Sequence, residues 1–327
     1  MSLLEIRGLE VTYAGHAGTR VRAVAHADLD VEAGQIVALV GESGCGKSSL
    51  GKAAVGLIAP SAGSIRFGGE PLDPLKRGGR PKAQRKLQMV FQDPFSSLNP
   101  RRRIGDLIAE GGRVASEAGE TPMSVGECLE RVGLSAAFAD RFPHQFSGGQ
   151  RQRIAIARAL AARPRCIVAD EPISALDASA QAAVANLLVS IVRDLDMGLL
   201  FISHDLAIVR SIADVTSVMY LGKIVESGSS AAVWRDPLHP YTRSLIAAIP
   251  RPDGKGTLPR DLPGDVPDPA HPPAGCRFHP RCPSVMAVCR EREPQREALQ
   301  PLRTAACFVA STANPAHDRP VATNFVA

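Results

Sequence analysis

The nine residues GESGCGKSS, at positions 41 to 49, constrain the fold more than any other stretch of this chain. They follow the run Ile36 to Val40, whose side chains are typical of a strand buried on both faces of a parallel sheet. Three glycines then permit a tight loop, and a stretch compatible with a helix begins at Lys47. This order of strand, glycine-rich loop and helix predicts a loop whose backbone amides bind a phosphate chain.

The residue types in this loop fit a nucleoside triphosphate. Lys47 would reach the β- and γ-phosphates, and the Ser48 hydroxyl would ligate Mg²⁺. The alternative is a glycine-rich turn beside a surface lysine, which the flanking strand and helix disfavour. The other residues of the loop that we expect at the nucleotide are Gly41, Ser43, Gly44, Cys45, Gly46 and Ser49.

A second apolar segment, CIVADE at positions 166 to 171, ends in two carboxylates. Asp170 would hold Mg²⁺ opposite Ser48, directly or through water. Glu171 would then polarise a water for in-line attack on the γ-phosphate. Two acids at the end of a buried strand need a cation or water to satisfy them, although a surface turn remains the alternative.

The segment FSGGQRQR, at positions 146 to 153, predicts a second anion site. Ser147 is a good N-cap, and Gly148 and Gly149 leave the first amides of the following helix uncovered. One γ-phosphate needs only one anion site of this kind, and this chain has two. The economical explanation is that two protomers meet head to tail, so that each lends this segment to the nucleotide of its partner.

The order and spacing of these motifs resemble those of the ATPase subunit of ABC transporters, over roughly residues 3 to 250. GESGCGKSS is similar to the Walker A motif, CIVADE to the Walker B motif with its catalytic glutamate, and FSGGQ to the signature motif, usually LSGGQ. Because no motif is degenerate, the resemblance implies a chain that hydrolyses ATP. Its catalytic residues would be Glu171, His204 and Lys47.

The resemblance also implies roles for residues that would mean little alone. Tyr13 fits the aromatic residue that stacks on adenine, and Gln92 fits the glutamine that touches Mg²⁺ and senses the transmembrane partner. His204 fits the histidine near the γ-phosphate, although a structural histidine is the alternative at a strand end. The residues expected at the ATP of the partner protomer are Ser147, Gly148, Gly149, Gln150 and Asp177.

Alternating strand-like and helix-like segments predict a three-layer α/β domain with a mainly parallel sheet, a P-loop NTPase core. We expect strands at 86–92, 166–170, 199–203 and 215–221, the last one entering a hairpin. We expect helices at 149–162 and 176–195, and a helical insertion at about 95–165. The predicted domains are an ATPase domain at 1–250 and a C-terminal extension at 251–327, which begins with a proline-rich stretch.

The composition of the 327 residues is that of a soluble globular protein, with 45% hydrophobic and 22% charged residues. No stretch reaches the ~18 apolar residues of a membrane span, and no signal peptide is evident. A cytosolic chain is therefore the default. The resemblance implies a peripheral position on the cytoplasmic face of the cell membrane.

Two segments narrow the resemblance to the peptide-importer branch, which serves dipeptides, oligopeptides and sometimes nickel. They are DPFSSLNPRRRIGDLI at 93–108 and LHPYTRSLIAAIP at 238–250. The resemblance implies two transmembrane permeases, a second ATPase subunit, identical or different, and an external substrate-binding protein. Segment 93–146 would receive a cytoplasmic helix of the permease.

Four of the seven cysteines crowd into 32 residues near the C-terminus, at Cys276, Cys282, Cys289 and Cys307. Four thiolates suit an iron–sulfur cluster or Zn²⁺, although the spacing lacks the usual C-x2–4-C of zinc sites. The tail resembles the C-terminal extension of peptide-importer ATPases, some of which hold a [4Fe-4S] cluster there. We expect that cluster, with Zn²⁺ or no metal as the alternatives.

One rival hypothesis is an ATP-dependent redox or metal sensor built on the cysteine tail, which would need no permease. The other is a soluble ABC ATPase that acts on nucleic acid or the ribosome. A basic stretch at 74–86 and Arg101 to Arg103 could touch nucleic acid or anionic lipid, or could form a solvated face. Relatives that act on DNA carry long coiled-coil insertions, and ribosomal ones carry two ATPase domains. This chain shows neither, so we expect no nucleic-acid partner. Nickel rather than peptide import stays open.

Overall fold

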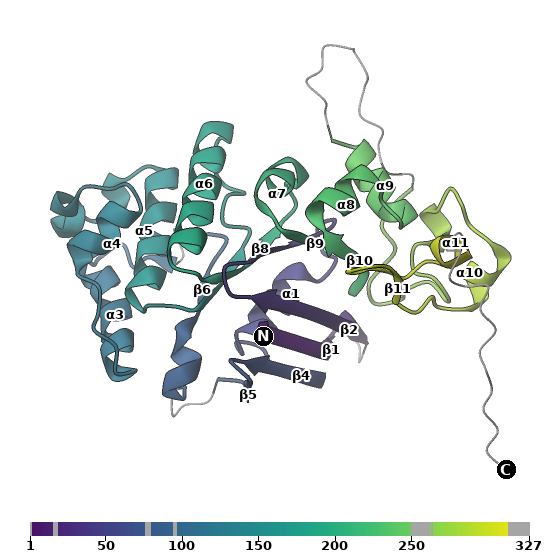
Figure 1. Cartoon of the computed structure of the whole chain (residues 1–327), viewed down its shortest axis with the longest axis horizontal. Coiled ribbons are helices and arrows are strands. Elements are labelled where there is room, and N and C mark those ends of the chain that lie inside the picture. Colours follow the sequence, from purple (N-terminus) through teal and green to yellow (C-terminus); the bar gives the residue numbers. More distant parts are fainter. Residues whose placement is uncertain are drawn as a thin grey trace.

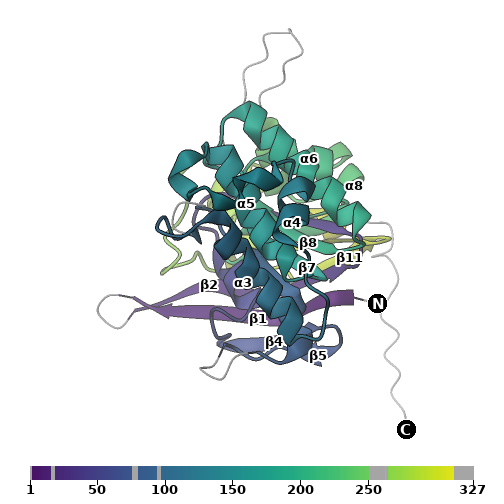
Figure 2. The same ribbon diagram turned by 90° about the vertical axis from the view of Figure 1, so that its left-hand side faces the viewer.

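A computed structural model describes residues 2–15, 19–75, 80–93, 97–249, 262 and 264–312. Two sheets and a layer of helices make up this part of the chain. Figure 1 shows the helices α3 to α6 at one end of the molecule and the C-terminal elements at the other. Figure 2 shows the smaller sheet below the larger one, with the helices above.

The larger sheet has eight strands among the described residues, and five neighbouring strands in it are parallel. In spatial order the strands are β11 (Glu297–Gln300), β12 (Arg303–Ala305), β10 (Lys223–Ser229), β9 (Val215–Tyr220), β3 (Ile36–Val40), β8 (Gly198–Ser203), β7 (Cys166–Asp170) and β6 (Leu87–Val90). The predicted strands and the predicted hairpin, which is β9–β10, are confirmed.

Both faces of the parallel strands are buried, as the apolar run Ile36–Val40 predicts. Along β3, Ile36, Ala38 and Val40 face the helical layer, while Val37 and Leu39 face the smaller sheet. All five side chains are at most 1% exposed. Alternating contacts of this kind require apolar residues at every position of a central strand.

The smaller sheet is antiparallel, with the order β2-β1-β4-β5. Its strands are β1 (Ser2–Ala14), β2 (Arg20–Glu32), β4 (Ala62–Phe67) and β5 (Glu70–Pro71). Helix α1 (Lys47–Ala54) touches β1 and β2 as well as β7 and β8, so it lies between the two sheets. The sequence did not predict this sheet, because its strands do not alternate with helices.

The chain between β6 and β7 is helical. Its elements are α3 (Ile104–Glu117), α4 (Val125–Arg131), η3 (Ala136–Asp140), η4 (Pro143–Gln145) and α5 (Gly148–Ala161). A short 3-10 helix, η2 (Lys82–Lys86), precedes β6, and α6 (Ala178–Asp194) follows β7. The predicted helices at 149–162 and 176–195 are therefore confirmed by α5 and α6.

The C-terminal elements are attached to the larger sheet. Strand β12 pairs with β10, and β11 pairs with β12, both antiparallel. These antiparallel pairs make the larger sheet mixed.

The remaining elements are α7 (Leu206–Ile212), α8 (Ser230–Arg235), α9 (Pro240–Ala247), η5 (His279–Arg281), α10 (Ala287–Glu291) and α11 (Phe308–Thr312). Most of the proline-rich stretch, and the predicted boundary at 250/251, lie outside the described residues.

No helix among the described residues is long and apolar enough to cross a bilayer.

His239 links the start of α9 to the sheet and is 2% exposed. Its Nδ1 accepts the amide hydrogen of Tyr241 at 3.0 Å, and its own amide donates to the Glu226 carboxylate at 2.8 Å. Burial lowers the pKa of His239 to about 3. The ring is therefore neutral in the folded chain at pH values where it is protonated in the unfolded chain.

We expect His239 to make stability depend on pH. Between about pH 3 and the ordinary value of 6.5, only the unfolded chain binds the proton, so the free energy of unfolding falls as pH falls, by up to about 1.4 kcal/mol per pH unit. His239→Asn keeps a capping oxygen but does not titrate. Urea unfolding measures the free energy of unfolding at pH 7 and at pH 5. The decrease between these two pH values should be about 2 kcal/mol smaller in this variant than in wild type. His144 is exposed and serves as the control. If His144→Asn reduced the pH dependence of stability as much as His239→Asn does, the role of His239 would be contradicted.

Candidate functional site

The carboxyl ends of the parallel strands bring the predicted site residues to one edge of the larger sheet. Val40 of β3 is in register with Ser203 of β8, and Asp170 of β7 is in register with Ile202. Val90 of β6 pairs with Ala169. The residues that follow these strand ends therefore lie close together, where open α/β sheets bind ligands.

The phosphate loop needs its glycines for two different reasons. Gly46 has a φ of 106°, and a Cβ there would lie 2.0 Å from the carbonyl oxygen of Ala23. Gly44 has a φ of 77° and faces open space, since a Cβ at this position would meet no atom within 4 Å. The backbone of the loop is therefore held against β2 on one side and open to a ligand on the other.

Lys47 is 4% exposed, and its ammonium group is held inside the loop. Its Nζ donates to the carbonyl oxygens of Gly41 at 2.8 Å and Glu42 at 2.9 Å. It also lies 3.8 Å from the Sγ of Cys45, a buried residue. The cation is thus held by two carbonyl oxygens of the loop itself.

Ser48 and Asp170 offer the oxygen ligands that Mg²⁺ prefers. The Ser48 hydroxyl donates to Asp170 Oδ1 at 2.8 Å, and Asp170 is 3% exposed. Burial raises the pKa of Asp170, so a cation at this point would stabilise its charged form. A hydroxyl and a carboxylate in contact, beside an open phosphate loop, fit a magnesium–nucleotide complex.

Glu171 has a φ of 45°, an uncommon backbone conformation for a residue with a side chain. Its amide donates to the carbonyl oxygen of Ile202 at 2.9 Å. Its Oε2 accepts a hydrogen bond from Gln92 Nε2 at 3.1 Å and lies 3.3 Å from His204 Nδ1. Strained backbone of this kind is concentrated at functional sites. Here it directs the Glu171 carboxylate towards the side-chain amide of Gln92 and the imidazole of His204.

Tyr13 lies beside the phosphate loop with its ring 40% exposed. Its hydroxyl donates to Ser49 Oγ at 3.1 Å. An exposed aromatic ring that is held at one end can offer its face to a planar base.

The FSGGQ segment begins helix α5, as the sequence predicts. Ser147 Oγ accepts the amide of Gln150 at 3.3 Å, and Gln150 Oε1 accepts the amide of Ser147 at 3.0 Å. Asp177 is the N-cap of α6, and its Oδ1 accepts the amide hydrogen of Ala180 at 2.9 Å. Hydrogen bonds from Ser179 and the helix amides lower the pKa of Asp177, so it is charged at neutral pH.

The contacts of α5 differ from those of the phosphate-loop helix. Helix α5 packs on α3, α4, α6 and β6, whereas α1 packs on the two sheets. Figure 1 draws α5 within the group of helices at one end of the molecule and α1 between the sheets. The exposed Ser147 therefore faces outward from a different part of the fold than Lys47 does.

Comparison with known proteins identifies the family in which this arrangement of residues occurs. A family profile described as "ABC transporter" matches residues 24–174, and one described as "Oligopeptide/dipeptide transporter, C-terminal region" matches residues 225–289. The putative oligopeptide transport ATP-binding protein YkfD of Bacillus subtilis (strain 168) is 44% identical, over 94% of this chain and 96% of YkfD. The oligopeptide transport ATP-binding protein AppF of the same organism is 42% identical, over 95% of this chain and 98% of AppF.

The chain belongs to the ABC transporter ATP-binding proteins, in the oligopeptide/dipeptide branch. As a member of this family it is an ATPase.

Solved structures agree with the fold of this ABC ATPase. CbiO1 from Clostridium perfringens, part of the transporter complex cbiONQ, has a TM-score of 0.61 and 27% identity, over 72% of this chain and 91% of that one. The ATP-binding cassette MJ0796, bound to ADP and Pi, has a TM-score of 0.59 and 24% identity, over 69% of this chain and 98% of that one. The second likeness concerns the fold alone. The predicted P-loop core is confirmed, as a mixed sheet with helices.

The predicted iron–sulfur or zinc site of the ABC ATPase is wrong. Among the residues that the structure describes, no group of three or more His, Cys, Asp or Glu side chains could hold a metal ion. Burial raises the pKa of Cys276 to about 11 and also raises those of Cys282 and Cys307, which disfavours their thiolate forms. All three and Cys289 are free cysteines. Cys276 and Cys282 pack against the main hydrophobic core, and Cys307 belongs to a small C-terminal cluster.

One group at the phosphate loop was not predicted from the sequence. The hydroxyl of Tyr241 accepts the amide hydrogen of Glu42 at 3.0 Å. Tyr241 belongs to the HPYT segment, which indicated only the branch of the family. An aromatic residue with a polar end in so short a motif was a signal for a buried hydrogen bond, but its partner, 199 residues away, could not be read from spacing.

Proposed function

We propose that this chain is the ATP-hydrolysing subunit of a peptide importer, and that it couples ATP binding and hydrolysis to uptake of dipeptides or oligopeptides. The observation that carries the proposal is the meeting of Glu171, Gln92 and His204 next to the Ser48–Asp170 pair. The names of the relatives YkfD and AppF support oligopeptides as the cargo, and favour a transporter subunit over a soluble ATPase that acts on nucleic acid.

The phosphate loop would bind the triphosphate through its amides. Lys47 would exchange its carbonyl partners for the β- and γ-phosphate oxygens, a charge-assisted contact. The loop residues Gly41, Ser43, Gly44, Cys45, Gly46 and Ser49 would surround the phosphates, and Tyr13 would stack on adenine. Ser48, Asp170 and Gln92 would hold Mg²⁺, which neutralises charge on the phosphates when bound.

Glu171 would act as the general base. Its carboxylate lies within hydrogen-bond distance of Gln92, and His204 lies 3.3 Å from it. In this position it would accept a proton from the attacking water, while the exposed His204 imidazole would contact the γ-phosphate. A side chain that is held from two sides keeps a fixed direction towards the water.

A second ATPase subunit would complete each ATP site. In that assembly Ser147, Gly148, Gly149 and Gln150 would supply a helix N-terminus to the γ-phosphate bound by the partner's phosphate loop. Asp177, exposed and charged, would reach across the same interface. The outward position of the α5 N-terminus and its separation from α1 within one chain support this arrangement.

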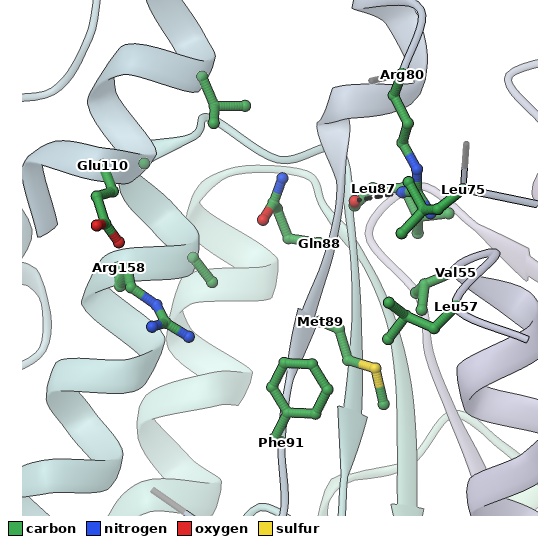
Figure 3. Close-up of a pocket in the computed structure, with 13 residues that line it drawn as sticks. Val55, Leu57, Leu75, Arg80, Leu87, Gln88, Met89, Phe91, Glu110 and Arg158 are labelled. Atoms are coloured by element: carbon green, nitrogen blue, oxygen red, sulfur yellow. Dashed lines mark hydrogen bonds between the residues drawn. The ribbon is translucent and has the colours of Figure 1, made fainter. Parts of the chain in front are cut away.

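A pocket between the helical region and the sheets would receive a permease helix. It has a volume of about 350 Å³. In Figure 3, Glu110 and Arg158 approach it from the helices, Met89 and Phe91 from the β6 segment, and Leu57 from the opposite side. The apolar residues on its margin are unusually exposed, Leu57 at 46% and Leu75 at 45%. This surface suits a short helix that has an apolar face and charged flanks.

The remaining partners follow from this role. We expect two transmembrane permeases, a second ATPase subunit of the same or a related sequence, and an external substrate-binding protein that delivers the peptide. The chain would then sit peripherally on the cytoplasmic face of the membrane, bound through the permeases. Closure of the ATP-bound pair would favour one state of the permeases, because the two states differ in affinity for the closed pair.

Uptake in cells tests the proposal. A strain that lacks this chain should lose uptake of a radiolabelled oligopeptide, and the wild-type chain should restore it. Glu171→Gln should not restore it, although the variant assembles. Uptake of radiolabelled Ni²⁺ measured in the same strains separates the two cargoes. Lost nickel uptake with intact peptide uptake would reject the proposed cargo.

A further inference from the structure

Glu42 is an acidic residue inside the phosphate loop, and its side chain is bound by the C-terminal extension. Arg281 donates through Nη1 to Glu42 Oε2 at 2.8 Å and through Nη2 to Oε1 at 3.0 Å. The Arg281 side chain is 4% exposed and that of Glu42 is 21% exposed. This bidentate pair joins residues that are 239 positions apart, and such pairs fix both position and orientation.

All three polar groups of Glu42 are fixed. Its carboxylate is held by Arg281, its amide donates to the Tyr241 hydroxyl at 3.0 Å, and its carbonyl oxygen accepts from Lys47 Nζ at 2.9 Å. The extension, the α9 helix and the lysine of the phosphate loop thus meet at one residue. A displacement of Arg281 would change the position of the Glu42 backbone, and with it a contact of Lys47.

Arg281 stands on a rigid aromatic support. It ends η5, which follows Phe278, a side chain that is 1% exposed. The ring of Phe278 lies 5.2 Å from that of Tyr220 and 5.3 Å from that of Tyr241. The rings of Tyr220 and Tyr241 are themselves 4.6 Å apart. Packing of this density leaves the base of the Arg281 side chain little freedom to move.

The charge of Glu42 explains why the loop needs this arginine. The loop binds a polyphosphate, and a carboxylate there would repel it. Arg281 pairs with both carboxylate oxygens, so the pair presents little net charge. Without Arg281, the partly buried acid would remain uncompensated next to the phosphates.

We propose that Arg281 is a positioning residue for the phosphate loop, and that the C-terminal extension is thereby a structural part of the ATP site. Arg281 would act through Glu42, without touching the nucleotide itself. It neutralises Glu42 and fixes the loop in the form that binds phosphate. The proposal concerns nucleotide binding, and it does not depend on which cargo is transported.

Nucleotide affinity in the full-length chain tests this role. Isothermal titration with MgADP should show Arg281→Met binding about tenfold more weakly than wild type, because the uncharged side chain leaves Glu42 unpaired. Arg281→Lys keeps the charge but loses the fork geometry, and should lose about threefold. This milder change keeps the test valid if Arg281→Met does not fold.

A matched control separates positioning from general support of the extension. Arg296 also ties the extension to the core, donating to Asp28 Oδ2 at 3.1 Å and to its carbonyl at 3.0 Å, on β2. Arg296→Met should change MgADP affinity by less than about twofold. Equal losses in Arg296→Met and Arg281→Met would overturn the proposal.

A double variant adds a readout that a purely structural role would not produce. In Glu42→Gln/Arg281→Met the loop carries no unpaired acid, so MgADP affinity should return to within about threefold of wild type. If the double variant binds as weakly as Arg281→Met alone, or more weakly, then charge compensation at Glu42 is not the function of Arg281.

Discussion

Replacement of Glu171 by glutamine is expected to lower ATP turnover by at least about 10²-fold, while MgATP binding persists, because an amide cannot accept the proton of the attacking water. The substitution keeps an oxygen that can accept the Gln92 hydrogen bond, so the geometry of the site should change little. Single-turnover hydrolysis of radiolabelled ATP measures the loss. Equilibrium binding of ATP to the same protein shows that the site is intact.

Glu127→Gln is the matched control for this prediction. Glu127 lies at the third position of α4, where its carboxylate completes a capping box with Ser124, and glutamine can fill the same role. Its turnover should equal that of wild type. Near-normal hydrolysis by Glu171→Gln would mean that another group is the general base, and it would contradict the central role that we propose for Glu171.

Arg303→Met is expected to lower the free energy of unfolding by about 3–5 kcal/mol, the cost of leaving a buried charge without its partner. Arg303 and Glu226 are 3% and 0% exposed, and Arg303 Nη2 donates to Glu226 Oε1 at 2.9 Å. The Glu226 carboxylate also accepts the amides of Leu238 and His239. Urea unfolding of the full-length chain measures the loss.

Two further variants test why Arg303→Met should lose stability. Arg7→Met removes an ion pair with Asp30 in which both side chains are nearly half exposed, so it should cost no more than about 1 kcal/mol. Glu226→Gln/Arg303→Met removes both charges and keeps an oxygen for one of the two amides, and should be more stable than Arg303→Met. If it is less stable, desolvation of Glu226 is not the source of the effect.

The sequence predicted the parts of the site that follow one another along the chain. A strand, a glycine-rich loop and a helix are local features, so GESGCGKSS indicated both its structure and its ligand. Ser147 was predicted as a helix start because its side chain can cap the next amides. The meeting of Glu171, Gln92 and His204 came from the resemblance, because local patterns do not give the order of strands.

Long-range pairing was beyond sequence reasoning. The contact of Arg281 with Glu42 and the addition of β12 to β10 join segments that share no pattern. The cysteine spacing was misleading for a similar reason. Thiols that are close in sequence suggest a metal site, but here burial disfavours the thiolate forms, and Cys276, Cys282 and Cys307 pack in hydrophobic clusters. Composition cannot distinguish a buried thiol from a ligand.

The pairing of β12 with β10 also bears on how the chain is made. During synthesis, β10 emerges long before residues 297–305, and until then its outer edge has unpaired amides and carbonyls. An open edge of this kind can pair with another chain and begin aggregation. A chain cut before residue 297 would keep this exposed edge permanently. We therefore expect shortened forms to accumulate as insoluble protein, even though every residue proposed to contact ATP is still present.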